Sequence, residues 1–240
     1  MSIDIVPLAP ADIPDAVDCV QRAFADDPYF RWVFSDSSKF NLQRNAASLA
    51  AHFQYGINCG CPISVAKIAA AGDRKTDREI KLPSGTIVGV AWWYSPRASS
   101  EAQTWLVWAQ DWLLSFRQFV NNARFGGRGG LSLSRYWIWK RVQQDAHDQL
   151  WTDPRGYYFC NMVGVSSLAR GMGVGKRLME DVMAKADREG MPCYLESSKG
   201  HPNVTIYEKM GFTLVKEIEC VEDGDVCKLY CMIRNPKTKS

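Results

Sequence analysis

The sequence lacks the features of a membrane-spanning or polyanion-binding protein. No stretch approaches the roughly 18 uninterrupted apolar residues that a membrane-spanning helix needs. The net charge is only +3, from 29 Lys and Arg against 26 Asp and Glu. That imbalance is too small to support electrostatic binding of DNA or RNA. We therefore expect neither a membrane nor a nucleic acid as a partner.

Cysteine is present, but not in the spacing of a metal site or of a secreted disulfide framework. The eight cysteines are scattered without CxxC pairs, so zinc is not expected, and no other metal is predicted. Residues 1–14 have no basic segment followed by an apolar core and do not resemble a signal peptide. We expect free thiols in a cytoplasmic protein; the oligomeric state is left open.

What the chain does have is ordinary globular composition with many aromatics. It has 240 residues, 46% apolar and 23% charged, which is enough to bury a sizeable core. We predict one domain over residues 1–240. Aromatic residues reach 12%, with nine Trp, which indicates either a tightly packed helical section or an aromatic pocket.

The first 94 residues alternate between strand and helix patterns. Ile3 and Ile5 predict a short strand, and Ile13–Phe24 a helix. A second helix is predicted after Asp36, with Phe40, Leu49 and Phe53 among its apolar positions and Gly56 ending it. Residues 63–70 and 86–94 predict an antiparallel strand pair, joined by an exposed polar loop at 72–81.

Residues 95–154 break this pattern and predict a helical hairpin inserted after the third strand. Aromatic side chains recur there every three or four residues, at Trp105, Trp108, Trp112, Phe116 and Phe119. A second helical run begins near Tyr136, and the glycines of 126–130 separate the two. For most of these aromatics core packing is the expectation, and for a few a wall over a substrate pocket.

A buried strand, a glycine loop and a helix follow one another after Pro154. Tyr157–Val165 is nearly continuously apolar, and Arg170–Gly175 (RGMGVG) follows it. Val174, Leu178, Val182 and Ala186 then predict one buried helix face, ended by Gly190. Such a loop presents backbone N–H groups at a helix N-terminus, where a phosphate or pyrophosphate binds.

The spacing of the loop argues against a dinucleotide fold. A G-x-G-x-x-G fingerprint would need glycine at the position of Lys176 or of Leu178. Arg170, Gly173 and Gly175 instead resemble motif A of the GNAT superfamily of acyl-CoA-dependent N-acetyltransferases. A second motif agrees, because Tyr207–Phe212 (YEKMGF) resembles the end of that family's closing helix.

The resemblance implies a fold and a co-substrate. The implied fold is a mixed, largely antiparallel twisted α/β sheet with a parallel pair at the acyl-CoA cleft, flanked by helices. The implied co-substrate is acetyl-CoA, with the backbone of Val163 and Val165 pairing with its pantetheine. The residues implied to bind the rest of the cofactor are Arg170, Gly171, Gly173, Val174, Gly175, Lys176 and Asn203.

Within the superfamily, the chain resembles puromycin N-acetyltransferase-like proteins most. The resemblance extends loosely over most of the chain. The matching segments are 23–28 (AFADDP), 163–166 (VGVS), 195–198 (LESS), 207–212 and 231–232. The Trp-rich insertion and the segment 199–202 (KGHP) depart from the pattern. Cofactor use therefore transfers to this chain better than substrate identity does.

Acyl transfer to an amine needs a base for the amine and an acid for the departing thiolate. The family's pattern implies that Tyr207 is the acid, although a buried structural tyrosine is the plainer alternative. Glu196, at a strand end facing the cleft, is our candidate base, with helix capping or ion pairing as its alternative. His201 is a candidate relay next to Glu196, or an ordinary solvated loop histidine.

Asp26, Asp27 and Trp93 are the predicted acceptor-binding residues. A carboxylate after the first helix could attract a cationic amine, but capping of the next turn, which begins at Pro28, is the plainer role. The predicted function is direct acetyl transfer to the amine of a small molecule, such as an antibiotic, toxin, polyamine or metabolite, as in detoxification. A non-catalytic acyl-CoA sensor or scaffold, and a protein or peptide N-acetyltransferase, are the alternatives.

Overall fold

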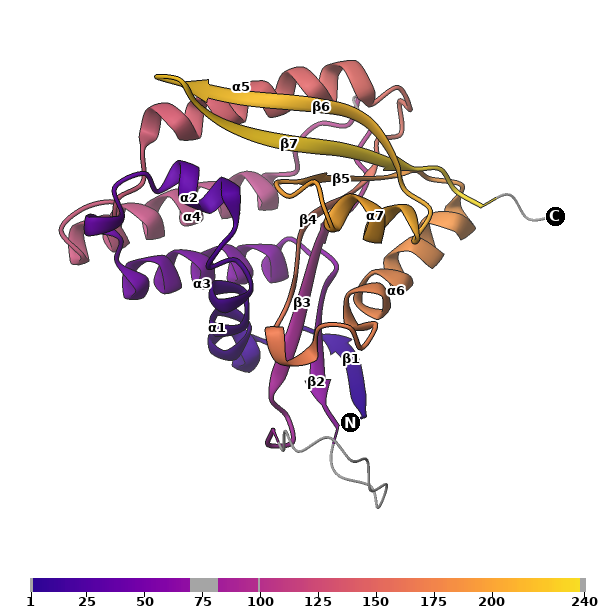
Figure 1. Cartoon of the computed structure of the whole chain (residues 1–240), viewed down its shortest axis with the longest axis horizontal. Helices are drawn as coiled ribbons and strands as arrows, with labels where there is room; N and C mark the ends of the chain where they lie inside the picture. Colours follow the sequence, from indigo (N-terminus) through magenta and orange to yellow (C-terminus); the bar gives the residue numbers. More distant parts are fainter. Residues whose placement is uncertain (1, 70–81, 99, 238–240) are drawn as a thin grey trace.

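The chain folds around one seven-stranded sheet with helices on both faces (Figure 1). A computed structural model describes residues 2–69, 82–98 and 100–237. The strand order is β1-β2-β3-β4-β5-β7-β6, and only β4 and β5 run parallel. The strands are β1 (Ile3–Pro7), β2 (Ile63–Ile68), β3 (Ile87–Tyr94), β4 (Tyr158–Val165), β5 (Cys193–Ser197), β6 (Thr213–Glu222) and β7 (Asp225–Arg234). This is the mixed, largely antiparallel sheet that the sequence predicted.

The two faces of the sheet are covered by different helices. One face packs against α1 (Ile13–Ala23), α2 (Pro28–Val33), α3 (Leu42–Asn58) and α5 (Leu133–Leu150). The other packs against α6 (Val174–Glu189) and the short α7 (Asn203–Glu208). Helix α4 (Trp105–Arg124) lies against α3.

Helix α6 forms as its sequence pattern predicted. Val174, Leu178, Val182 and Ala186 are all buried against the sheet. Gly190 closes the helix in the left-handed region, with φ of 65°, where a side chain would be strained. The helix therefore begins after Gly173 and ends at Gly190. The preceding loop sets the position of its N-terminus.

Helix α3 differs from its prediction at both ends. Phe40 lies before the helix, and Gly56 lies inside it rather than ending it. A Cβ at Gly56 would come within 2.7 Å of Ile63 Cδ1 and 2.9 Å of Trp92 Cζ2, so the glycine permits close approach to the sheet. The predicted strand 63–70 ends at Ile68, and the predicted loop 72–81 lies outside the described residues.

Helices α4 and α5 lie in the segment 95–154, where the sequence predicted a helical hairpin, but the expected core packing of the aromatics is wrong for α4. Five aromatic side chains of α4 are 57–79% exposed: Trp105, Trp108, Trp112, Phe116 and Phe119. The side of α4 that contacts α3 is polar instead. Ser48 Oγ donates to Gln118 Oε1 at 2.9 Å, and Asn121 Nδ2 donates to the Arg44 carbonyl at 3.1 Å.

The remaining whole-chain expectations concern thiols and membrane spans. All eight cysteines are free thiols, as predicted, and six of them are buried. Among the described residues, no helix combines the length and apolarity needed to cross a bilayer.

Candidate active site

Strands β4 and β5 separate after a short parallel ladder. Their pairing ends at Cys160 and Leu195, after three residue pairs. Strand β4 continues to Val165 while paired only with β3 on its other side. An open strand edge of this kind can accept an extended ligand as an added strand. Val163 and Val165, the predicted pantetheine contacts, lie on this uncovered stretch.

The glycine loop follows β4 and leads into α6. Gly171 and Gly173 have φ of 76° and 73°, in the left-handed region. A Cβ at either would meet no heavy atom within 4 Å, so these glycines serve backbone conformation rather than packing. The amides of the first turn, at Val174, Gly175 and Lys176, have no acceptor within the helix. Together with the positive end of the helix dipole, they form a cradle suited to a pyrophosphate.

The cations near the loop have different roles. Arg170 is exposed and close enough to Asp26 to help lower the pKa of that carboxyl. Lys176 is mostly exposed, 3.7 Å from Glu180. Arg177 donates to the Ile3 carbonyl at 2.8 Å and so ties α6 to β1. Arg170 and Lys176 therefore remain available to a phosphate, whereas Arg177 has a structural partner.

Glu196 is the first residue of β5 beyond the parallel ladder, and its carboxylate is held by three side chains. Tyr194 donates its hydroxyl to Oε1 at 2.9 Å, and Gln143 Nε2 donates to Oε2 at 2.7 Å. His147 Nε2 lies 3.1 Å from Oε1. The Glu196 side chain is only 6% exposed. This arrangement fixes the carboxylate and leaves it little direct access to solvent.

His147 comes from the inserted helix α5 and was not predicted as a site residue. Its ring stacks on Trp151, with centroids 4.2 Å apart, and meets Phe159 and Tyr194 edge-on. The predicted relay His201 is exposed, and no hydrogen bond joins it to Glu196 in the described structure. The histidine beside Glu196 is therefore a different one, 49 residues away in sequence.

Tyr207 lies on α7, on the opposite face of the sheet from the Glu196 side chain. It packs against the cluster that contains Cys160 and Leu195, where the parallel ladder ends. Burial raises the pKa of the Tyr207 hydroxyl, with further contributions from Cys160 and Asp27. The hydroxyl is therefore protonated at neutral pH and can donate a proton. Glu196 and Tyr207 approach the separated strands from opposite sides.

The loop after α1 meets the loop after β5 through two carboxylates. Asp27 caps α2 by accepting from the amides of Tyr29 and Phe30, and Ser198 Oγ donates to its other oxygen at 2.5 Å. Burial raises the pKa of Asp27. Asp26 pairs with Lys199 at 3.1 Å, which lowers its pKa. Asp27 thus has the capping role that was the plainer expectation for it. Both carboxylates have hydrogen-bond partners within the protein.

Two other predicted site residues, Asn203 and Trp93, contact other parts of the protein. Asn203 begins α7 and donates to Ser197 Oγ at 3.4 Å. Trp93, predicted to bind the acceptor, is 1% exposed and lies in the core cluster with Cys160 and Met179. The structure therefore does not bring Trp93 to an acceptor surface. Side chains alternate between the two faces of β3, and the Trp93 ring lies on the face that α6 covers.

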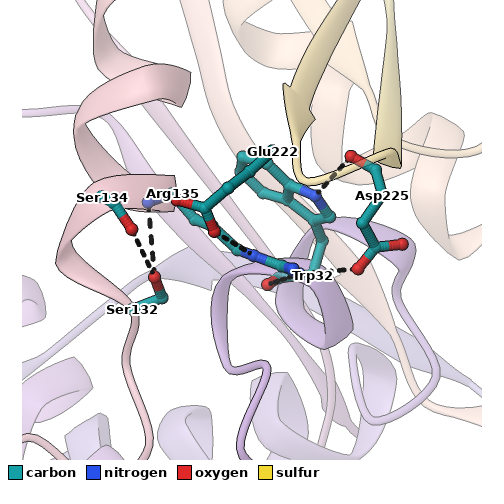
Figure 2. Close-up of polar contacts among 6 residues, drawn as sticks. All are labelled: Trp32, Ser132, Ser134, Arg135, Glu222 and Asp225. Carbon is teal, nitrogen blue, oxygen red and sulfur yellow. Dashed lines mark hydrogen bonds and ion pairs between the residues drawn. The ribbon is translucent and has the colours of Figure 1, made fainter.

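Arg135 ties the start of α5 to α2 and to the β6–β7 hairpin (Figure 2). Its guanidinium binds Glu222 at 2.7 Å and Asp225 at 2.8 Å, on the two arms of the β6–β7 hairpin. The same guanidinium donates to the Trp32 carbonyl at 3.0 Å. The start of α5, the end of α2 and the tip of the β6–β7 hairpin are therefore held together, which positions Gln143 and His147 further along α5.

The segment of the chain that contains the site is similar to known acetyltransferase sequences. Residues 133–214 match the model of the acetyltransferase (GNAT) domain. An uncharacterized N-acetyltransferase of Schizosaccharomyces pombe is 44% identical over 78 residues, which are 32% of this chain. The match spans only 31% of the length of that curated relative.

Solved structures share the fold over the whole chain. An acetyltransferase from Corynebacterium glutamicum, related to histone acetyltransferase HPA2, has a TM-score of 0.56 at 24% identity; the match covers 100% of this chain and 99% of that one. Arylalkylamine N-acetyltransferase 2 from Aedes aegypti has a TM-score of 0.58 at 16% identity, covering 99% and 100%. The separated strands, the glycine loop, Glu196 and Tyr207 all lie within the matched segment 133–214. The segment that builds this site therefore resembles a GNAT acetyltransferase domain.

Proposed function

We propose that the protein is an N-acetyltransferase that moves the acetyl group of acetyl-CoA directly to the amine of a small molecule. The observation that carries the proposal is the end of the β4–β5 ladder at Cys160 and Leu195, beside the glycine N-terminus of α6. An extended pantetheine chain fits the open edge of β4, and a pyrophosphate fits the loop amides. Acetyl-CoA supplies an activated thioester.

In this proposal the pair of His147 and Glu196 removes the proton from the acceptor amine. If Nε2–H of His147 donates to Glu196, the Nδ1 atom keeps the lone pair that accepts a proton. Glu196 then stabilises the imidazolium that forms. The predicted base thus acts through a histidine, because three donors already occupy the oxygens of its carboxylate.

Tyr207 is proposed to complete the reaction as the acid. The amine nitrogen forms a bond to the acetyl carbon, the C–S bond breaks, and the sulfur receives the proton of the Tyr207 hydroxyl. The raised pKa of Tyr207 keeps that proton in place until the thiolate forms. The second proton that the ammonium nitrogen loses, as the amide forms, returns to the tyrosine, and the proton on His147 is released to solvent.

The acceptor is proposed to be a small cationic amine in a cytoplasmic setting. Asp26, whose side chain is 58% exposed and pairs with Lys199, places a carboxylate next to the site. Free thiols support a reducing compartment. The resemblance to puromycin N-acetyltransferase-like proteins makes puromycin one specific candidate.

The deciding experiment measures thiol release from acetyl-CoA with a panel of amines. The panel contains puromycin, a polyamine, an arylalkylamine and a peptide with a free N-terminus, with mass spectrometry of each product. Acetylation of a small amine is the expected result. Acetylation of the peptide alone would establish the peptide transferase instead, and tight CoA binding without any product would establish the sensor.

A further inference from the structure

The outward face of α4 carries an aromatic stripe, formed by Trp105, Trp108, Trp112, Phe116 and Phe119. These side chains are 57–79% exposed. They recur every three or four residues, so they form one line of roughly 21 Å along the helix. Leu106, Leu113 and Val120, each 37–45% exposed, widen it on one side.

The stripe is too large for an ordinary exposed patch. At roughly 200 Å² for a whole aromatic side chain, its five rings expose on the order of 650 Å². The largest apolar patch on a typical monomer is roughly 300–600 Å², and patches above that size mark interaction sites. The aliphatic residues beside the stripe add further area.

The opposite side of α4 is polar and contacts α3, which leaves the aromatic stripe exposed. Asn58 Nδ2 donates to Gln110 Oε1 at 2.9 Å, and Arg44 donates to Asn122 Oδ1 at 2.8 Å. With Gln118 and Asn121, these residues form the contact of α4 with α3. Turning the aromatic stripe inward would bury it but would leave these polar groups without partners. The helix is therefore built with its apolar side outward.

Cations accompany the aromatic stripe along α4 and the loop after it. Residues 105–130 contain three arginines, Arg117, Arg124 and Arg128, and one acid, Asp111, a net charge of +2. Arg117 and Arg124 lie four residues after Leu113 and Val120, and so are their neighbours on the helix surface. Arg128 and Phe119 line one hollow of about 610 Å³ at the end of the helix.

This combination favours an anionic lipid surface over a second copy of the chain. Tryptophan prefers the interface between water and hydrocarbon, and flanking cations attract anionic headgroups. A helix that lies in this interface has to be amphipathic but need not span the bilayer. An antiparallel two-fold contact through the aromatic stripe would bring the Arg117 and Arg124 sides of the two helices together, which is unfavourable.

We propose that the aromatic stripe of α4, bordered by Arg117, Arg124 and Arg128, docks the protein on the surface of an anionic lipid bilayer. This peripheral contact departs from the expectation of no membrane partner, which rested on the lack of a long apolar run; a helix that lies on a bilayer surface needs no such run. The contact does not depend on the acetyl-transfer reaction, because none of these residues belongs to the proposed active site.

Vesicle flotation of the whole chain tests the proposal. Binding is expected to vesicles of phosphatidylcholine with about 30% phosphatidylserine, to be weaker on phosphatidylcholine alone, and to fall with salt. Quenching of tryptophan emission by brominated lipids is expected in the bound state. Equal binding to both vesicles, or none to either, would overturn the proposal.

Two variants separate the apolar and the charged contributions. Trp108→Ser/Trp112→Ser/Phe116→Ser is expected to weaken binding at least about 1,000-fold, since each buried aromatic contributes roughly tenfold or more. Arg117→Glu/Arg124→Glu is expected to weaken it at least roughly 25-fold, about fivefold per charge removed. The charge variant leaves the aromatic stripe intact, so it tests the proposal even if the first variant fails to fold.

Matched controls lie on other faces of the molecule. Val215→Ser/Val226→Ser removes apolar residues that are 42% and 46% exposed, and Arg188→Glu reverses an exposed charge on α6. Both are expected to bind vesicles like the wild type. Wild-type binding by both α4 variants would refute the proposal. A dimer that the stripe variant disperses, without vesicle binding by the wild type, would assign the face to a second copy and refute it as well.

Discussion

At the residue scale, burial and hydrogen bonding decide what each polar side chain of the site can do. Tyr207 is half-buried and its raised pKa keeps the hydroxyl protonated. Glu196 has its oxygens engaged by Tyr194, Gln143 and His147. Sequence could nominate Glu196 and Tyr207 because both stand next to recognisable motifs. His147 has no local motif, and only the packing of α5 brings it to Glu196.

Tyr207→Phe tests the proposed acid. The change keeps the ring and its packing but removes the hydroxyl, so kcat is expected to fall roughly 10²-fold, a usual size for one general acid. The affinity for CoA, measured by calorimetry, is expected to stay within a factor of about two because no binding group is lost. Tyr157→Phe is the control: its hydroxyl bonds to the backbone of Leu150 and Thr152 and to no proposed catalytic residue, and kcat should be unchanged. An unchanged kcat in Tyr207→Phe would remove the acid role.

His147→Gln and Glu196→Gln test the proposed base. In the wild type, kcat/KM for a fixed amine is expected to rise with pH through one enzymic ionisation, and both variants should lose that limb. Two amines with well separated pKa values distinguish this ionisation from that of the acceptor itself. If the limb follows the amine in all three proteins, the enzyme selects the neutral fraction of its substrate, and neither residue is the base. A purely structural Glu196 would instead lower the melting temperature and keep the limb.

At the element scale, the same residue type serves two different ends of α6. Gly173 precedes the first turn and Gly190 follows the last, and both are left-handed, with φ of 73° and 65°. Neither glycine has a heavy atom within 4 Å of an added Cβ. The two positions therefore have similar backbone conformation and packing. They differ because Gly173 lies in the loop proposed to bind the pyrophosphate and Gly190 does not.

Gly173→Asn and Gly190→Asn form a matched pair that tests the phosphate cradle. Asparagine tolerates the left-handed region better than other side chains, so both variants should fold with similar melting temperatures. A side chain at 173 would occupy the approach to the loop amides, and CoA affinity is expected to fall roughly tenfold or more. Gly190→Asn should bind CoA like the wild type. Equal affinities in a calorimetric titration would contradict the assignment of the loop.

At the scale of the whole molecule, one ion pair joins the last strand to the helix that presents the cradle. Arg234 of β7 binds both carboxylate oxygens of Asp187 on α6, at 2.8 and 2.7 Å. The arginine side chain is 4% exposed and that of Asp187 is 23% exposed. Arg234 lowers the pKa of Asp187, so the pair stabilises the fold only when Asp187 is ionised.

Asp187→Asn is expected to make the free energy of unfolding less dependent on pH in the acidic range. A lowered carboxyl pKa contributes stability that is present above the unfolded value, near 3.8, and is lost as the pH falls through the folded value. At pH 7 the variant should lose about 2–3 kcal/mol of unfolding free energy, since Arg234 stays buried without its partner. Below the pH at which the folded Asp187 carboxyl becomes protonated, the two proteins should unfold alike. Asp181→Asn, exposed on the same helix, is the control in urea titrations; an equal loss for both variants would show that the pair has no special role.

The sequence by itself determined the elements that depend on neighbours along the chain. The buried stripe and end glycine of α6, the loop glycines and strand β5 follow from local periodicity and backbone conformation. The tertiary structure alone decided which side of α4 faces outward, why Gly56 lies inside α3, and which histidine meets Glu196. Those outcomes depend on contacts between segments far apart in sequence. A periodic pattern reveals that a helix has two unlike faces, whereas the partner that each face meets is set by packing and by the need to satisfy buried polar groups.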